Sequence, residues 1–281
     1  MSGLLNAKSD DGRAADEDVD SLVADLRTQG VVVVRDVLSA KECDFYRGRL
    51  DRQLKERIDS GSYCGNETNQ VLDNYFQTDQ ELLPLIYQEL TDRVMRRMID
   101  DDYVLISPSA RNRRTLSGFE FGRKTSGVGW HTDSRFIGGG QGTKPSLCYM
   151  TILCVDAFAK ENGATHFIPN SHLRYQRPAD RDADLDYNFL IAPQGAMVIF
   201  DTALWHRIGD GTEKSRWGVF NTYGPWFMKP YHRFDEMVPR ATLDEMPPIF
   251  KQLLHLDSIP PKDHNESMIT LRRVRAAVEG Q

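Results

Sequence analysis

The sequence is poor in cysteine and contains no long apolar run. Its four cysteines are widely spaced and form no Cys-x-x-Cys pair, so we expect neither a disulfide framework nor a cysteine-rich zinc site. No stretch approaches the roughly 18 to 20 apolar residues that cross a bilayer, and the polar start MSGLLNAKSDDGR lacks the apolar segment of a signal peptide. These absences predict a soluble, cytoplasmic protein with reduced cysteines and no membrane partner.

The chain also lacks an excess of positive charge, internal repeats and low-complexity segments. Its 35 Lys and Arg residues against 41 Asp and Glu give a net charge of −6, so nucleic acid is not an expected partner. The hydrophobic share of 40% is ordinary for a globular protein and provides for a real core. A small molecule is the expected partner, and nothing in the sequence fixes the oligomeric state.

The first part of the chain predicts a helical layer. Residues 1–16 are polar and acidic and are expected to form a flexible tail, ahead of a single domain over 17–281. Within 17–100 we expect three helices. The first is an apolar stripe from Val19 to Leu26, capped by Gly30 and followed by a strand; the second runs from the capping box Ser39–Glu42 to about 58; the third lies between 79 and 99.

From about residue 103 the pattern changes to short β-rich runs separated by Gly, Pro, Asn and Asp. Many short strands without long helices between them predict a sandwich or barrel core over about 103–226. A C-terminal segment over about 227–281 is expected to form a lid with one or two helices after 240. The expected strands cover 103–107, 115–122, 146–155, 164–168, 188–192, 196–201 and 216–223.

His131-Thr-Asp133 places an imidazole and a carboxylate two positions apart. Residues i and i+2 of an extended strand project from the same face, so both side chains can reach one metal ion. The spacing alone is weak evidence, because it recurs at His255-Leu-Asp257. The first copy follows a Gly-rich turn among expected strands, whereas the second lies in a Pro-rich tail. We therefore take His131 and Asp133 as the candidate metal ligands.

His206 and Arg216 complete a possible site further along the chain. His206 follows the expected strand 196–201, and two imidazoles with one carboxylate on one face of Fe(II) leave positions open for a co-substrate and oxygen. Arg216 begins another β run, and its guanidinium can grip a carboxylate of a dicarboxylic acid through two parallel hydrogen bonds. The alternatives are a hydrogen-bonded core histidine and a surface ion-pair arginine.

With these residues the chain resembles the phytanoyl-CoA hydroxylase family of Fe(II)- and 2-oxoglutarate-dependent oxygenases. The resemblance extends from about Val19 to residue 226. It is carried further by the opening LRTQGVVVVR from Leu26, by the segment ENGATHFIPNSH from Glu161, and by the strand ending at Asp201. The family usually has Gly where this chain has Asn170; because Asn tolerates a left-handed backbone, the turn is expected to survive.

The resemblance implies a mainly β fold with α additions: a double-stranded β-helix, the cupin-like jelly roll, flanked by the N-terminal helices. It implies that His131, Asp133 and His206 bind Fe(II) and that Arg216 binds the tail carboxylate of 2-oxoglutarate. Tyr149 or Thr151 would add a hydroxyl to that carboxylate. His166 and His172 are expected to be structural.

The implied reaction is the oxidation of an unactivated C–H bond with O2, releasing succinate and CO2. Because related halogenases lack the carboxylate ligand, Asp133 favours hydroxylation over chlorination. Desaturation, ring closure and rearrangement use the same ligands and stay open. The expected substrate is a small-molecule metabolite of natural-product or specialised metabolism. The residues expected to line its binding site are Trp130, Arg135, Phe136 and Trp226.

Several alternatives remain at this point. The same chemistry on an acyl-CoA is one, although no adenine or pyrophosphate motif is evident. A jelly-roll protein that binds a ligand without turnover is another, and structural zinc is disfavoured because such sites are usually Cys-rich. The basic stretch 109–124, which includes Arg111, either receives an anionic substrate or is a solvated face.

Overall fold

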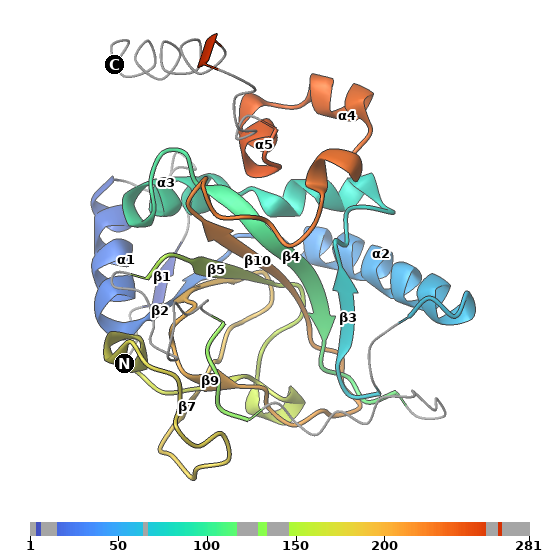
Figure 1. Cartoon of the computed structure of the whole chain (residues 1–281). Coiled ribbons are helices and arrows are strands. Elements are labelled where there is room, and N and C mark those ends of the chain that lie inside the picture. Colours follow the sequence, from blue (N-terminus) through green and yellow to red (C-terminus); the bar gives the residue numbers. More distant parts are fainter. Residues whose placement is uncertain are drawn as a thin grey trace.

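Figure 1 shows the computed structural model, in which helices cover one side of a large β-sheet and a small second sheet lies on the other side. The structure describes residues 4–6, 16–63, 67–116, 129–133, 146–256 and 264–265. Among the helices in these segments, none is both long enough and apolar enough to cross a membrane.

The large sheet has seven strands. Its pairings are antiparallel apart from that of β1 with β2. In spatial order the strands are β1 (Leu4–Asn6), β2 (Val31–Arg35), β8 (Met197–Asp201), β5 (Tyr149–Cys154), β10 (Trp217–Gly224), β4 (Val104–Asn112) and β3 (Gln70–Asp73).

The small sheet has three antiparallel strands and closes the sandwich opposite the helices. Their spatial order is β7 (Asn188–Phe189), β6 (His166–Phe167) and β9 (His206–Arg207). Two packed and mainly antiparallel sheets, in which strands far apart in sequence lie side by side, make the jelly-roll core that the family resemblance implied. The single-domain boundary at 17–281 stays a prediction.

The main helices form where the apolar periodicity predicted them. The stripe from Val19 to Leu26 is buried, and the first helix ends at Gly30, which has a positive φ of 80° and donates its N–H to the Leu26 carbonyl at 2.9 Å. At the second helix the Ser39 N–H donates to Glu42 Oε2 at 2.7 Å, which completes the capping box. The helices are α1 (Asp16–Gln29), α2 (Ala40–Asp59), α3 (Glu89–Met98), α4 (Arg240–Glu245) and α5 (Pro248–Leu253), with 3-10 turns η1 (Gln80–Ile86), η2 (Lys160–Asn162), η3 (Ser171–Arg174) and η4 (Phe234–Glu236).

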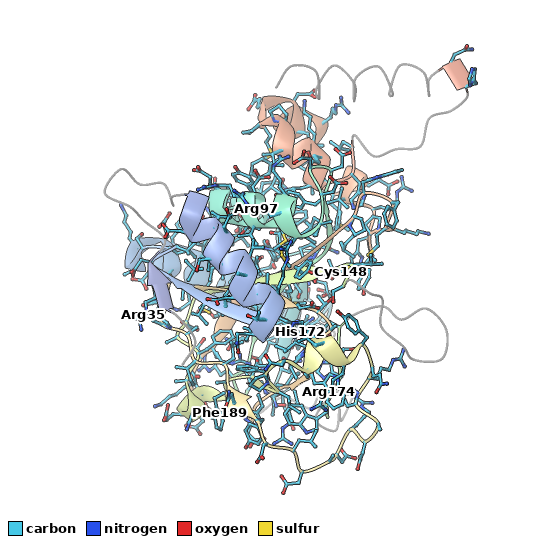
Figure 2. All side chains as sticks on the ribbon, turned by 90° about the vertical axis from the view of Figure 1, so that its left-hand side faces the viewer. Arg35, Arg97, Cys148, His172, Arg174 and Phe189 are labelled. Atoms are coloured by element: carbon cyan, nitrogen blue, oxygen red, sulfur yellow. The ribbon has the colours of Figure 1, made fainter. Side chains whose placement is uncertain are left out.

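His172 ties α1 to the rest of the fold. Figure 2 shows it next to the end of α1, where its Nε2 lies 3.0 Å from the Arg27 carbonyl oxygen. The preceding turn contains Asn170 at φ 60°, so Asn does adopt the left-handed backbone expected of it. His172 therefore supports the packing of α1, consistent with the structural role expected for it.

Three expectations need correction. Residues 4–6 do not belong to a loose tail, because β1 pairs in parallel with β2. The single helix expected over 79–99 is divided, since Pro84 lies in a 3-10 turn and Tyr87 is extended before α3 begins. The strand expected at 103–107 continues to Asn112, where it pairs with both β3 and β10. Of the strand expected at 115–122, residues 117–122 lie outside the described residues.

The large sheet is buried on both faces. One face packs against α1, α2, α3 and the C-terminal helices, and it includes Tyr149 and Leu153 of β5. The other face looks into the sandwich and includes Met150 and Ile152 of the same strand. This alternation decides which side chains of a strand reach the interior cavity.

Candidate metal and co-substrate site

His131 and His206 are held together by their own backbones. The His131 N–H donates to the His206 carbonyl and the His206 N–H donates to the His131 carbonyl, each at 3.0 Å. Asp133 is fixed in the same way, because its N–H donates to the Thr202 carbonyl at 2.9 Å. Two segments separated by some seventy residues are thereby joined at the position where the three side chains meet.

The three side chains point their ligand atoms at one another. Nε2 of His206 lies 3.4 Å from one carboxylate oxygen of Asp133, and Nε2 of His131 lies 3.8 Å from the other. All three ligand atoms fall within 4.8 Å of one another, and among the described residues this is the one such group of His, Cys, Asp and Glu. Two imidazoles and a carboxylate at this spacing fit a facial three-ligand metal site.

Backbone carbonyls set the orientation of both imidazoles. Nδ1 of His131 lies 2.8 Å from the Gly129 carbonyl oxygen, and Nδ1 of His206 lies 2.9 Å from that of Leu204. A ring that donates its Nδ1–H to a carbonyl keeps its proton there and leaves the Nε2 lone pair for a metal ion. Both histidines are thus prepared as neutral ligands.

The surroundings shift the pKa values of the three side chains in different directions. Burial, with a smaller contribution from His206, lowers the pKa of His131 to about 4. Burial opposes the charged forms of His206 and Asp133, but their mutual attraction outweighs it, so the pKa of His206 is raised and that of Asp133 is lowered. In the metal-free site His206 therefore retains its proton to a higher pH than His131 does.

We expect the affinity for a divalent metal to rise with pH through the neutral range. A metal ion must displace the proton of His206, whose pKa is raised, whereas His131 is already neutral there. Titrations with Mn(II) in buffers of differing ionisation enthalpy measure both the affinity and the proton release. An affinity that is constant across neutral pH, with no proton released, would contradict this assignment.

Arg216 lies in the same interior cavity and has unused hydrogen-bonding capacity. It is 5% exposed, its guanidinium stacks over the Phe158 ring at 4.3 Å, and its Nε and Nη1 are buried without a hydrogen-bond partner. Burial and the neighbouring cations Arg113 and Arg111 lower the pKa of Arg216 to about 9. A buried guanidinium with two unpaired N–H groups is suited to bind an anionic ligand, because the anion would supply both missing hydrogen-bond acceptors.

A network of buried polar groups holds the backbone around Arg216. The Arg216 N–H donates to Asn112 Oδ1 at 2.8 Å. Asp156 accepts the Trp217 N–H at 2.8 Å and the Ser215 hydroxyl at 2.7 Å. The other oxygen of Asp156 accepts Nε of Arg47 at 2.6 Å. Asp156 therefore fixes the residues on both sides of Arg216.

Replacing Asp156 with asparagine is expected to weaken 2-oxoglutarate binding about tenfold, the lower end of the effect of removing an orienting partner. Asparagine cannot accept from Arg47, Ser215 and Trp217 at once, so Arg216 loses its fixed position. Calorimetric titration with 2-oxoglutarate in the presence of Mn(II) measures this. Asp44→Asn is the matched control, because Asp44 pairs with the same Arg47 but its side chain is 70% exposed. Equal affinity in both variants would remove Asp156 from this role.

The family model of phytanoyl-CoA dioxygenase matches residues 26–217, about two thirds of the chain, and the match includes all four site residues. The chain belongs to the phytanoyl-CoA dioxygenase family. The family resemblance seen in the sequence is confirmed, and so is the class of enzyme, a dioxygenase that uses iron, 2-oxoglutarate and oxygen. The triad fits the metal of this family, and the partnerless guanidinium fits its dicarboxylic co-substrate.

Several curated proteins are similar in sequence. The dioxygenase trt7 of Aspergillus terreus is 22% identical over 82% of this chain and 81% of its own length. The dioxygenase af480 of Aspergillus fumigatus is 31% identical, but the alignment covers 38% of this chain and 36% of that protein. An uncharacterized protein of Mycobacterium tuberculosis, Rv1501, is 27% identical over 37% of this chain and 38% of its own length.

Among solved structures, HygX from Streptomyces hygroscopicus has a similar fold. The form with nickel and 2-oxoglutarate bound superposes with a TM-score of 0.56 at 16% identity, covering 78% of this chain and 90% of HygX. The form with iron bound gives a TM-score of 0.55 at 13% identity, covering 75% and 89%. At this identity the likeness shows the fold, and it agrees with the two-sheet core described above.

The cavity that contains the family's candidate site is mostly apolar. Its polar members besides the triad and Arg216 are Asn69, Thr165 and Arg111. The apolar members are Val31, Met150, Ile152, Phe167, Leu190, Phe200, Leu204, Ile208 and Phe220.

Tyr149 and Thr151 do not reach this cavity, so the expected hydroxyl contact with 2-oxoglutarate needs correction. They lie on the helix-facing side of β5, whereas the cavity is lined by Met150 and Ile152. Thr151 instead hydrogen-bonds the buried Tyr223. The physical reason is the phase of the strand, because adjacent residues of β5 point to opposite faces.

Two of the four expected substrate-lining residues are placed elsewhere. Trp130 is 1% exposed and packs with Ile168 and Trp205, and its indole N–H donates to the Ala183 carbonyl at 3.0 Å. Trp226 is 51% exposed and packs edge-on against Phe227 at the surface. Neither lines the cavity. Arg135 and Phe136 lie outside the described residues.

Phe158 is a residue of the site that the sequence did not predict. Its ring supports the guanidinium of Arg216 although 57 positions separate them along the chain. No local pattern distinguishes it from other buried aromatic residues. In the repeated motif, His255 hydrogen-bonds the Leu105 carbonyl oxygen at 2.8 Å, whereas Asp257 lies outside the described residues, so the reading of this motif as a decoy stays a prediction.

Proposed function

We propose that His131, Asp133 and His206 bind one Fe(II) ion and that Arg216 binds the distal carboxylate of 2-oxoglutarate. We further propose that the enzyme hydroxylates an unactivated C–H bond of a small-molecule metabolite in natural-product or specialised metabolism. The observation that carries the proposal is the meeting of the triad and a partnerless buried guanidinium in one cavity. HygX, solved with nickel and 2-oxoglutarate, supports it through a similar fold.

The protein supplies position and environment, while the bound iron and 2-oxoglutarate supply the capacity to activate oxygen. His131 and His206 present neutral Nε2 atoms, and Asp133 supplies the negative ligand. Arg216 fixes one end of the co-substrate, so that its other end is directed toward the triad. The three side chains of the triad would hold the metal ion, and three ligands of this kind would leave it accessible to the co-substrate and oxygen.

The cavity walls restrict what can approach the metal. Phe167, Phe200 and Phe220 line the cavity near the triad and offer no group for competing acid–base chemistry. Apolar walls also exclude water, which strengthens the contact of Arg216 with a carboxylate. Such a cavity favours a compact substrate with an apolar part over a strongly hydrated one.

The proposal is tested by incubating purified protein with Fe(II), ascorbate, 2-oxoglutarate and a metabolite library that includes acyl-CoA thioesters. We expect succinate release that depends on both metal and substrate, with a product that has gained one oxygen atom. A product that has lost two hydrogen atoms would indicate desaturation instead. Ligands that bind without any 2-oxoglutarate consumption would support a non-catalytic binding protein and contradict the proposal. The cytoplasmic location stays a prediction.

A further inference from the structure

Arg111 is a second cation in the cavity, and it comes from a different strand. It lies on β4 directly opposite Gly218 of β10, so its side chain projects from the sheet face that carries Phe220. The guanidinium lies over the Phe220 ring at 5.1 Å. Nε donates to the Ser109 hydroxyl at 3.1 Å, which fixes one edge of the guanidinium, and the side chain lines the cavity.

Arg111 has no ion-pair partner among the residues that the structure describes. Other arginines of these segments do have one, for example Arg47 with Asp156 and Arg49 with Asp79. The electrostatic influence of Arg111 is directed at the site. After burial and the charge of Arg113, the charge of Arg111 contributes to the lowered pKa of Arg216.

When iron and 2-oxoglutarate are bound, the positive charge of Arg111 has no negative counterpart among the described residues of the site. In the proposed complex, Fe(II) and Arg216 contribute three positive charges, which the Asp133 carboxylate and the two carboxylates of 2-oxoglutarate offset. Arg111 then adds one positive charge to a largely apolar cavity. Arg111 is half-buried at the cavity wall, where a cation paired with a hydrogen-bonded anion is more stable than an unpaired one. One further negative charge would therefore balance the charges of the described part of the cavity.

We propose that Arg111 binds a carboxylate of the substrate and so makes the enzyme selective for monoanionic acids. This inference rests on the proposed function, because the charge balance assumes iron and 2-oxoglutarate in place. A carboxylate supplies the one missing charge and matches the planar fork, whereas a phosphate monoester carries nearly two charges and is larger. The paired carboxylate fixes one end of the substrate, and the C–H bond to be oxidised lies at a set distance from that end.

The test uses the anaerobic complex of the full chain with Fe(II) and saturating 2-oxoglutarate, formed first and monitored by its visible absorption band. The probes are butyrate against butyramide, benzoate against benzamide, and propyl phosphate. We expect each carboxylate to bind at least about tenfold more tightly than its uncharged partner, as for a charge-assisted hydrogen bond. Propyl phosphate is expected to bind more weakly than butyrate.

Variants assign this preference to Arg111. Arg111→Gln is expected to remove the preference for the acid while leaving the 2-oxoglutarate band, and Arg111→Lys is expected to keep part of it. The matched control is Arg52→Gln, because Arg52 is exposed on α2. Equal binding of acids and amides by the wild type, a preference that survives in Arg111→Gln, or tighter binding of propyl phosphate would overturn the inference.

The same measurements separate this inference from the proposed function. If the wild type forms the complex but shows no preference for acids, the role of Arg111 is wrong and the proposed function stands. If Arg111→Gln no longer binds 2-oxoglutarate, Arg111 holds the co-substrate and the inference is overturned. If the wild type binds neither iron nor 2-oxoglutarate, both proposals are wrong.

Discussion

Replacing Arg216 with methionine is expected to stabilise the metal-free protein while abolishing its binding of 2-oxoglutarate. Nε and Nη1 of Arg216 are buried without partners, and such a group costs about 1–3 kcal/mol of folding free energy. Methionine keeps an apolar side chain against Phe158 and removes the buried charge. We therefore expect the free energy of unfolding to rise by an amount in that range.

The same substitution removes both hydrogen bonds to the carboxylate of the co-substrate. At about 1.5–3 kcal/mol for each bond to a charged group, the affinity should fall by at least about a hundredfold. Urea unfolding without ligand and calorimetric titration with 2-oxoglutarate measure the two effects. 2-Oxoglutarate should no longer raise the melting temperature of the variant.

Arg216→Lys separates charge from geometry in this experiment. Lysine keeps the positive charge but not the planar fork, so we expect weak binding without the gain in stability. Arg52→Met is the control for replacing an exposed arginine. A less stable Arg216→Met protein that still binds 2-oxoglutarate normally would show that Arg216 is a packing residue.

Alanine at His131 or His206 is expected to reduce succinate formation to the level of the metal-free protein. Each substitution removes one of three ligands from an ion whose open positions the reaction requires, so both binding and turnover are lost. Metal content after dialysis and succinate release are measured together. His264→Ala is the control, because His264 is exposed and belongs to a His-x-Glu sequence in the C-terminal segment.

Failure of this prediction has a clear form. If His206→Ala retained metal and turnover while Asp133→Ala lost both, the second imidazole would not be a ligand. Circular dichroism tests whether each variant folds. We expect that it does, since the backbone hydrogen bonds between positions 131 and 206 do not depend on the side chains.

The candidate metal site could be predicted from the sequence because its information is local. His131 and Asp133 lie two residues apart on an extended segment, and His206 and Arg216 follow in an order shared with a known family. The reciprocal hydrogen bonds that bring His206 to His131 could not be predicted, because pairing between distant segments leaves no local pattern. The resemblance supplied that connection.

The error at Tyr149 and Thr151 has a physical cause. A strand with one solvated face alternates polar and apolar residues, which reveals its phase. All six residues of β5 are buried, so the sequence YMTILC carries no such alternation. The side chains that face the metal could therefore not be told from those that face the helices, and a one-residue error exchanges the two faces.

The other errors arise from contacts between distant parts of the chain. Leu4–Asn6 form a strand because β2 offers a free edge, not because of their own pattern. Phe158 supports Arg216 through the packing of the sandwich, and its sequence neighbours do not indicate this. Trp130, next to a metal ligand in sequence, points away from the cavity into a separate cluster.

The backbone pairing of His131 with His206 also bears on how such enzymes diversify. Main-chain atoms, which every substitution except proline leaves in place, set the spacing of the two imidazoles. The walls of the cavity come from other strands, among them β2, β4 and β5. Related enzymes that keep this backbone pair can therefore differ in the residues of the cavity wall, and so in their substrates, while they keep the same metal ligands and the same reaction with oxygen.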